Sequence, residues 1–290
     1  MHKSGFVNIL GNPNVGKSTI MNSMVGRKLS IVSPKVQTTR HRIMGILNGE
    51  DYQIVYSDTP GIIEPKYKLH EAMMKSVRSA LTDADIIMYV TDVVENVDRE
   101  NEILVKIKKS DIPVIIVINK IDLSSQPEVE SLSIKWKEWF SGSPVVPVSA
   151  ITGFNLDTLL KTILELLPEG APYFPKDQVT NRIERFFASE IIREKIFLNY
   201  RNEIPYCTEV EIESFNDLEN LSKIKAVIHV TRESQKGIII GHQGSMLKKV
   251  GTEARKEMEE FFGRKIYLEL YVKVSKEWRD NPAMLKRFGY

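Results

Sequence analysis

One segment of eight residues near the start of the chain limits what it can fold into more than any other feature. It follows the apolar run 6–10, which has the character of a buried strand, and it reads Gly11-Asn12-Pro13-Asn14-Val15-Gly16-Lys17-Ser18. Glycines at this spacing let backbone N–H groups turn inward around a phosphate. The lysine then reaches the β- and γ-phosphates, and the serine hydroxyl can ligate Mg²⁺. The segment, called the phosphate loop below, predicts a nucleoside triphosphate site formed by Asn12, Pro13, Asn14, Val15, Gly16, Lys17, Ser18 and Thr19.

Length and composition set broad limits on the rest of the chain. A length of 290 residues suggests about two domains, and 42% hydrophobic and 27% charged residues are ordinary for a globular protein. The sole cysteine, Cys207, cannot form an internal disulfide, which fits a reducing cytosol. There is no apolar run of roughly 20 residues and no room for a signal peptide before the first strand. We therefore expect a cytoplasmic protein, whose net charge of +2 does not by itself indicate nucleic acid.

The pattern up to residue 170 alternates between β and α. Strands are predicted around 54–56, 85–90, 114–118 and 145–148, and helices over 98–109, 128–140 and 155–167, the last with Asn155 as N-cap. Residues 43–57 read as an antiparallel hairpin at the sheet edge. These elements predict an α/β nucleotide-binding domain with a mostly parallel six-stranded sheet.

Three prolines and a glycine within residues 168–175 predict a stiff connector and a domain boundary. We place the nucleotide-binding domain at 1–170, a linker at 171–180 and a second, α+β domain at 181–290. The second domain opens with a long helix over about 181–200. Strands follow around 207–214 and 223–231, then two helices around Gly241–Gly244, then a strand over 266–274.

A second motif indicates which base is bound. Asn119-Lys120-Ile121-Asp122 directly follows the 114–118 strand, at the strand end where ligands gather in open α/β sheets. The Asp122 carboxylate can accept hydrogen bonds from guanine N1–H and the 2-amino group, whereas adenine would leave it unpaired. We expect Asn119 to tie this segment to the phosphate loop and the Lys120 stem to lie over the base. The segment Ser149-Ala150-Ile151 can present the Ala150 N–H to guanine O6, so the predicted ligand is GTP or GDP.

A third motif, Asp58-Thr59-Pro60-Gly61, follows a strand and completes the predicted phosphate site. Asp58 is placed to hold Mg²⁺ through water, and the Gly61 N–H to contact the γ-phosphate. These segments resemble the sequence motifs of translation-factor-related GTPases, over residues 5–167. The remaining motif is a threonine, for which Thr38 and Thr39 are both candidates and Thr39 is favoured. The predicted magnesium set is Ser18, Thr39 and Asp58.

One position departs from the pattern of Ras-like GTPases, many of which carry a water-orienting glutamine after this motif. Here the residue is Ile62, followed by Ile63, and neither side chain can position water. We therefore expect slow intrinsic hydrolysis, with Lys17, Thr39, Gly61 and Asn14 as the catalytic candidates. In relatives with a hydrophobic residue at the position of Ile62, an asparagine matching Asn14 can ligate K⁺. The alternative is that Asn14 serves loop geometry alone.

The second domain carries Gly241-His242-Gln243-Gly244 between two predicted helices, which resembles the GxxG loop of KH domains. Such a loop clamps about four nucleotides by their backbone because glycines let phosphates approach closely. The strand order suits the prokaryotic, type II form of KH domain. The predicted RNA contacts are Lys236, Gly237, Ile240, Gly241, His242, Gln243, Gly244, Lys248 and Lys249.

A GTPase domain, a proline-rich connector and a C-terminal KH domain together resemble the Era family of bacterial ribosome-assembly GTPases. The resemblance spans essentially the whole chain, including its end, from Tyr271 through Trp278 to Tyr290. It implies binding near the 3′ end of 16S rRNA, a role in 30S subunit assembly, a monomer and loose association with the inner membrane face. Two alternatives stay open: a constitutive RNA-binding protein with GTP as a structural ligand, and a GTPase of another ribosome- or tRNA-related family.

Overall fold

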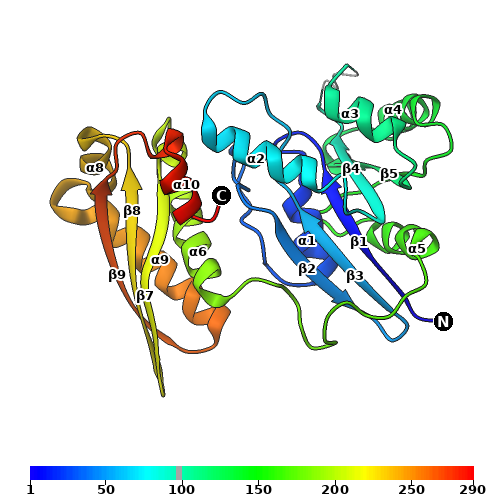
Figure 1. Ribbon diagram of the computed structural model, residues 1–290. Helices are drawn as coiled ribbons and strands as arrows, with labels where there is room; N and C mark the ends of the chain where they lie inside the picture. The colour runs from blue at the N-terminus through cyan, green and yellow to red at the C-terminus, as the bar shows by residue number, and fades with distance from the viewer. Residues whose placement is uncertain (96–99) are drawn as a thin grey trace. The chain divides into compact units, whose positions relative to one another are not determined.

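The computed structural model describes residues 1–95 and 100–290, which fall into two compact units (Figure 1). The first unit comprises Met1–Ser30, Thr39–Pro65 and Ala72–Asn181. The second comprises Ile31–Thr38, Lys66–Glu71 and Arg182–Tyr290. Two short segments from the N-terminal half of the sequence thus belong to the C-terminal unit, which no sequence pattern predicted.

A six-stranded sheet in the order β2-β3-β1-β4-β5-β6 forms the centre of the first unit within the described residues. All neighbours pair in parallel except β2 and β3, which form the predicted antiparallel hairpin at one edge. This confirms the predicted fold class. The strands are β1 (Lys3–Leu10), β2 (Ile43–Asn48), β3 (Tyr52–Asp58), β4 (Ile86–Asp92), β5 (Val114–Asn119) and β6 (Val145–Pro147).

Every residue of β4 and β5 is buried, so both faces of the sheet are covered at these two strands, as in other parallel sheets with helices on both sides. The helices are α1 (Lys17–Val25), α2 (Lys68–Ser79), α3 (Glu102–Lys109), α4 (Gln126–Trp139) and α5 (Leu156–Leu166), with a 3₁₀ turn at Ile121–Leu123. Part of the helix predicted over 98–109 lies outside the described residues. Asn155 is the N-cap of α5, as predicted, although with φ 63° its side chain does not cap the helix and donates to the Pro147 carbonyl at 2.7 Å.

The proline-rich segment is bonded to the first unit along much of its length. The Ile46 N–H donates to the Val179 carbonyl at 2.9 Å, and the N–H groups of Tyr173 and Phe174 donate to the Gln53 side chain. Prolines suit this position because such a segment needs few backbone donors. The connector therefore lies against the β2–β3 hairpin.

The second unit contains a three-stranded sheet in the order β7-β8-β9, with β7 antiparallel and β9 parallel to β8. Figure 1 shows α6 and α9 lying along one face of this sheet, and their apolar residues form the core with those of the strands. Apart from the short helices Ile204–Cys207 and Pro282–Arg287, the elements follow the order α-β-β-α-α-β, which confirms the predicted type II KH topology. The elements are α6 (Glu184–Asn199), α7 (Ile204–Cys207), β7 (Glu209–Leu218), β8 (Leu221–Val230), α8 (Glu233–Ile240), α9 (Ser245–Phe262), β9 (Lys265–Val274) and α10 (Pro282–Arg287), with 3₁₀ turns at His242–Gly244 and Trp278–Asp280.

None of the helices in the described part of the chain combines the length and the apolar character that crossing a membrane requires.

Candidate functional site

The phosphate loop connects β1 to α1, and Lys17 is the first residue of that helix. Its buried ammonium group donates to the carbonyls of Gly11 at 3.0 Å and Asn12 at 2.8 Å. Burial lowers the pKa of Lys17 to about 8, against the opposing fields of Asp58 and Glu95. A buried cation at a helix N-terminus favours an anionic ligand, because the helix dipole and the exposed N–H groups there add positive potential.

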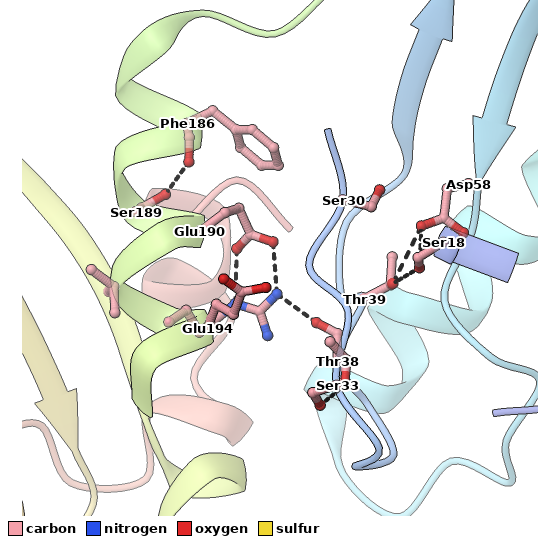
Figure 2. A network of polar contacts seen from close by, with 12 residues as sticks. Ser18, Ser30, Ser33, Thr38, Thr39, Asp58, Phe186, Ser189, Glu190 and Glu194 are labelled. Atoms are coloured by element: carbon pink, nitrogen blue, oxygen red, sulfur yellow. Dashed lines mark hydrogen bonds and ion pairs between the residues drawn. The ribbon is translucent and has the colours of Figure 1, made fainter. Parts of the chain in front are cut away.

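The predicted magnesium ligands come together from three separate segments (Figure 2). The Ser18 hydroxyl donates to Asp58 Oδ2 at 2.6 Å and lies 2.9 Å from Thr39 Oγ1, which is 3.4 Å from the same carboxylate oxygen. The second carboxylate oxygen, Asp58 Oδ1, is buried and has no hydrogen-bond partner among the described residues. Burial raises the pKa of Asp58, against the hydrogen bond from Ser18 and the field of Lys17.

This donor set fits a hard divalent cation such as Mg²⁺, which prefers carboxylate and hydroxyl oxygens. A cation beside the unpartnered Asp58 oxygen would offset the cost of burying the carboxylate. Between the two threonine candidates the geometry favours Thr39. The Thr38 hydroxyl is used elsewhere, since it donates to the Lys35 carbonyl at 2.6 Å and is hydrogen-bonded to Ser33 at 2.7 Å.

The segment after β3 packs closely against the phosphate loop. A methyl group added at Gly61 would lie 2.8 Å from backbone atoms of Pro13, so glycine permits this approach. Thr59 is fully buried and donates to the Ile9 carbonyl at 2.7 Å. Ile62 is 7% exposed, and its N–H donates to the Gly11 carbonyl at 3.1 Å. The residue after Gly61 is thus a buried hydrocarbon, as expected, and offers no polar group to a water molecule.

The predicted base-recognition segments lie where β5 and β6 end. Asn119 Nδ2 donates to the Val15 carbonyl at 2.8 Å, which confirms the expected tie between this segment and the phosphate loop. The Ser149 hydroxyl donates to Asp122 Oδ1 at 2.6 Å and orients that carboxylate. The Ala150 N–H donates to Asn119 Oδ1 at 3.0 Å. A guanine O6 would therefore have to share or replace that bond, which the sequence did not reveal.

Two carboxylates near this site were missed by sequence reasoning. Asp92, at the end of β4, accepts from the Lys120 ammonium at 2.5 Å and fixes the far end of that side chain. Glu95 accepts from the Asn12 amide and, at 2.7 Å, from Thr91. Burial raises the pKa of Glu95, against those two hydrogen bonds. Their position at the end of β4 and just beyond it was the available signal, but the sequence pattern does not show which side chains they meet.

Asn14 adopts a left-handed backbone conformation, with φ 65°. Asparagine tolerates this conformation better than most residues, so the loop-geometry reading gains direct support. The hypothesis that Asn14 ligates K⁺ is compatible with the same backbone conformation, because the ligand would be the side-chain amide oxygen.

The GxxG segment of the second unit forms a tight turn between α8 and α9. Gly241 has φ 72° and ψ 176°, a conformation that only glycine adopts without strain, and Gly244 has φ 77°. His242 and Gln243 at the turn are exposed, as are Lys248 and Lys249 in the first turns of α9. Lys236, Gly237 and Ile240 lie on α8, on the other side of the turn. The predicted RNA contacts therefore border one turn.

An aromatic pair packs at the margin of the core of the second unit. Phe261 and Phe262 at the end of α9 pack against the buried cluster of the second unit, with their rings 5.2 Å apart.

Comparisons with known proteins match both units. A family model described as 50S ribosome-binding GTPase matches residues 6–120, and a model described as KH domain matches residues 203–279. The chain is 45% identical over 293 residues to GTPase Era of Syntrophus aciditrophicus (strain SB), covering 100% of this chain and 96% of the relative. It is 46% identical over 292 residues to GTPase Era of Caldicellulosiruptor saccharolyticus, covering 99% and 97%.

Among solved structures, the chain resembles one described as Era in complex with MgGDPNP and nucleotides 1506–1542 of 16S ribosomal RNA. The TM-score is 0.96 at 42% identity, covering 100% of this chain and 99% of the other.

Proposed function

This chain belongs to the Era family of GTPases, and from that premise we propose that it is a GTP-controlled factor that binds 16S rRNA near its 3′ end and assists 30S subunit assembly. The chain is a GTPase, which hydrolyses GTP to GDP and phosphate. The observation that carries the proposal is the presence of both sites in one chain, a nucleotide site in the first unit and a GxxG turn in the second. The solved relative with both units contains both kinds of ligand.

The residues of the first unit have distinct parts in hydrolysis. The phosphate loop and Lys17 hold the β- and γ-phosphates, and Asp122 and Asn119 hold the base and its segment. Ser18, Thr39 and Asp58 would hold Mg²⁺, which when bound supplies positive charge where the leaving phosphate oxygens become more negative. Thr39 connects the γ-phosphate site to the segment Ile31–Thr38, which directly precedes it in the sequence. The remaining assigned contacts are Thr59, Pro60, Gly61, Ser149, Ala150 and Ile151.

Water orientation is the step for which the chain offers no dedicated side chain at position 62. We propose that the missing charge and orientation come from K⁺ held with the help of Asn14, or from a group supplied by the ribosomal partner. Either source makes hydrolysis by the isolated protein slow, because the attacking water is poorly positioned.

The solved full-length relative supports our choice of ribosomal partner. The family model over residues 6–120 names the 50S subunit, but it covers only the GTPase part. The solved relative that aligns over the whole chain is bound to 16S rRNA, an RNA of the small subunit. We therefore assign residues 1–170 to GTP binding, 171–180 to the linker and 181–290 to RNA binding, with the 30S subunit as partner.

We further propose a cytoplasmic monomer that associates loosely with the inner face of the membrane. The membrane part rests on the family resemblance alone. Light scattering of the purified protein tests the monomer, and co-sedimentation with anionic vesicles tests the association.

Turnover measured with and without 30S subunits tests the main proposal. We expect GTP hydrolysis to rise several-fold with subunits that have an accessible 16S rRNA 3′ end, and no response to 50S subunits. Equal turnover under all conditions, with RNA binding intact, would instead indicate a constitutive RNA-binding protein in which GTP is a structural ligand.

A further inference from the structure

The segment Ile31–Thr38 is bonded to α6 at three points, all within the second unit. The Val32 N–H donates to Glu194 at 3.4 Å. The Lys35 ammonium donates to the carbonyls of Phe197 and Tyr200, at the C-terminal end of α6 where helix carbonyls lack intrahelical donors. The third point is the Thr38 carbonyl, which accepts from Arg193.

The Arg193 side chain is 1% exposed and forms two parallel hydrogen bonds to Glu190, at 2.8 and 2.7 Å. From the same guanidinium, Nη2 donates to the Thr38 carbonyl at 2.5 Å (Figure 2). Burial alone would lower the pKa of Arg193, but the Glu190 carboxylate outweighs this and the pKa is raised, so the charge persists. A buried ion pair often adds little stability compared with an apolar pair, so its presence here calls for another reason.

The chain itself supplies that reason, because Thr38 is directly followed by Thr39. The Thr38 side chain is tied down by Ser33 and by the Lys35 carbonyl, at 2.7 and 2.6 Å. Thr38 is therefore held by its carbonyl and its hydroxyl, which leaves the next residue little freedom. Thr39 is the first residue of the following stretch of the first unit and lies beside Ser18 and Asp58.

We propose that Arg193 is a positioning residue for Thr39: by holding the Thr38 carbonyl, it keeps the Thr39 hydroxyl at the magnesium and γ-phosphate site. This inference rests on the proposed GTP-controlled function. When Thr39 is released after hydrolysis, the Thr38 carbonyl moves with it. The hydrogen bond from Arg193 then transmits this movement to α6, a helix in the core of the RNA-binding unit. Arg193 Nη1 is buried without a partner among the described residues, so the guanidinium has an N–H group that can donate to the Thr38 carbonyl after it shifts.

The test uses substitutions that do not leave a buried charge unpaired. Arg193→Lys keeps a cation against Glu190 but cannot reproduce the forked geometry together with the bond to Thr38. Lys35→Met removes the second anchor, whose side chain is partly exposed. Glu184→Gln is the matched control, since it removes an ion pair with Arg264 at the other end of α6. Circular dichroism confirms that each variant is folded.

The first readout is kcat and KM for GTP without RNA, in a double-mutant cycle with Thr39→Ala. We expect Arg193→Lys and Lys35→Met to lower kcat by about 3- to 30-fold with KM nearly unchanged, whereas Glu184→Gln keeps the wild-type kcat. In the Thr39→Ala background, Arg193→Lys should have no further effect. If the double variant instead loses the product of the two single-variant factors in kcat, the inference is overturned, because Arg193 would then not act through Thr39.

The second readout separates this inference from the proposed function. It is the ratio of affinities for a 16S rRNA 3′-end oligonucleotide with a non-hydrolysable GTP analogue and with GDP. A wild-type ratio of 1 would contradict GTP control of RNA binding while leaving the kinetic cycle to decide on Arg193. With a wild-type ratio above 1, an unchanged ratio in folded Arg193→Lys and Lys35→Met would contradict transmission through α6.

Discussion

At the residue scale, we propose that Asp122 determines the choice of base. Its carboxylate is oriented by the Ser149 hydroxyl at 2.6 Å, which leaves its remaining lone pairs for the two donors on the guanine edge. The loop that carries it is fixed in turn by Asn119, through the bond to the Val15 carbonyl. We therefore expect base choice to depend on the orientation of this one carboxylate.

Asp122→Asn should reverse this preference. The amide cannot accept from both guanine donors, so GTP affinity should fall by about 10²-fold, whereas xanthosine triphosphate, whose C2 carbonyl needs a donor, should gain. Calorimetry with both nucleotides measures the effect, and Asp157→Asn, an exposed acid in the first turn of α5, is the control. Equal GTP affinity for Asp122→Asn and the wild type would rule out this assignment.

Asn14 either helps to ligate K⁺ or serves loop geometry alone, and its backbone conformation is compatible with both hypotheses. If its amide helps to hold K⁺, hydrolysis should rise several-fold when K⁺ replaces Na⁺ at constant ionic strength. Asn14→Ala should remove that difference. Asn14→Gly is the informative partner, since glycine keeps φ near 65° without strain and removes the amide.

A K⁺ response that survives in Asn14→Gly would assign Asn14 to loop geometry alone. No K⁺ response in the wild type, with and without 30S subunits, would point to a partner-supplied group.

At the element scale, the site residues at the strand ends of the first unit could be predicted from the sequence, whereas the buried face of α6 could not. Ser18, Asp58 and Asn119 each follow or end a strand in a parallel sheet, so topology alone brings them together. The sequence of α6 instead shows Glu190 three residues before Arg193, which is the spacing of an ordinary surface ion pair. The buried Arg193 contacts the segment Ile31–Thr38, which is distant in the sequence, and the local periodicity of α6 carries no information about that contact.

The buried pair on α6 makes a prediction about stability. Arg193→Ala leaves Glu190 as an unpaired buried charge and should destabilise the second unit by about 3–5 kcal/mol. Arg255→Ala, which breaks a more exposed pair with Glu259 on α9, should cost about 0–1 kcal/mol. Urea unfolding followed by circular dichroism compares the two. Similar costs for both variants would show that burial of Arg193 is not energetically important.

The GxxG turn makes a prediction about RNA. Changing Gly241 and Gly244 to Asp adds two anions and two Cβ atoms where phosphates must approach, so RNA affinity should fall by at least about 10²-fold while GTP affinity survives. Gly244→Asp alone is the milder variant, since a Cβ at Gly241 would meet Met246 at 2.7 Å, whereas the space around Gly244 is open.

Gly263→Asp is the matched control for that turn. Gly263 also has a positive φ and open space, and it lies at the far end of α9. Tight RNA binding by folded Gly244→Asp would remove the turn from the RNA site.

At the scale of the whole molecule, the division into units differs from the division of the sequence. The sequence predicted a GTPase part with a mostly parallel six-stranded sheet, a connector and a type II KH part, and the structure confirms both folds. That Ile31–Thr38 and Lys66–Glu71 belong with the second unit was not predictable, because the loops around a nucleotide site have no periodicity of their own. Both segments flank residues assigned to the γ-phosphate site, Thr39 and Gly61.

Because these segments connect the two units, we expect GTP binding and RNA binding to be coupled. GTP binding should order Thr39 and the segment after Gly61, and such segments are the mobile parts of GTPase switches. If that ordering changes RNA affinity, thermodynamic linkage requires RNA to change GTP affinity by the same factor, which for coupled sites is typically about 5- to 150-fold. Thr39→Ala should uncouple the two ligands even where each still binds.

The most direct test is one pair of titrations on the full chain. RNA affinity is measured with GDP and with a non-hydrolysable GTP analogue, and the affinity for each nucleotide is then measured with and without RNA. The account predicts tighter RNA binding in the GTP-analogue form, an equal factor in the converse titration, and loss of both factors in Thr39→Ala. RNA affinities that agree within error for the two nucleotides, in both directions of the titration, would contradict it and leave two tethered domains that bind their ligands independently.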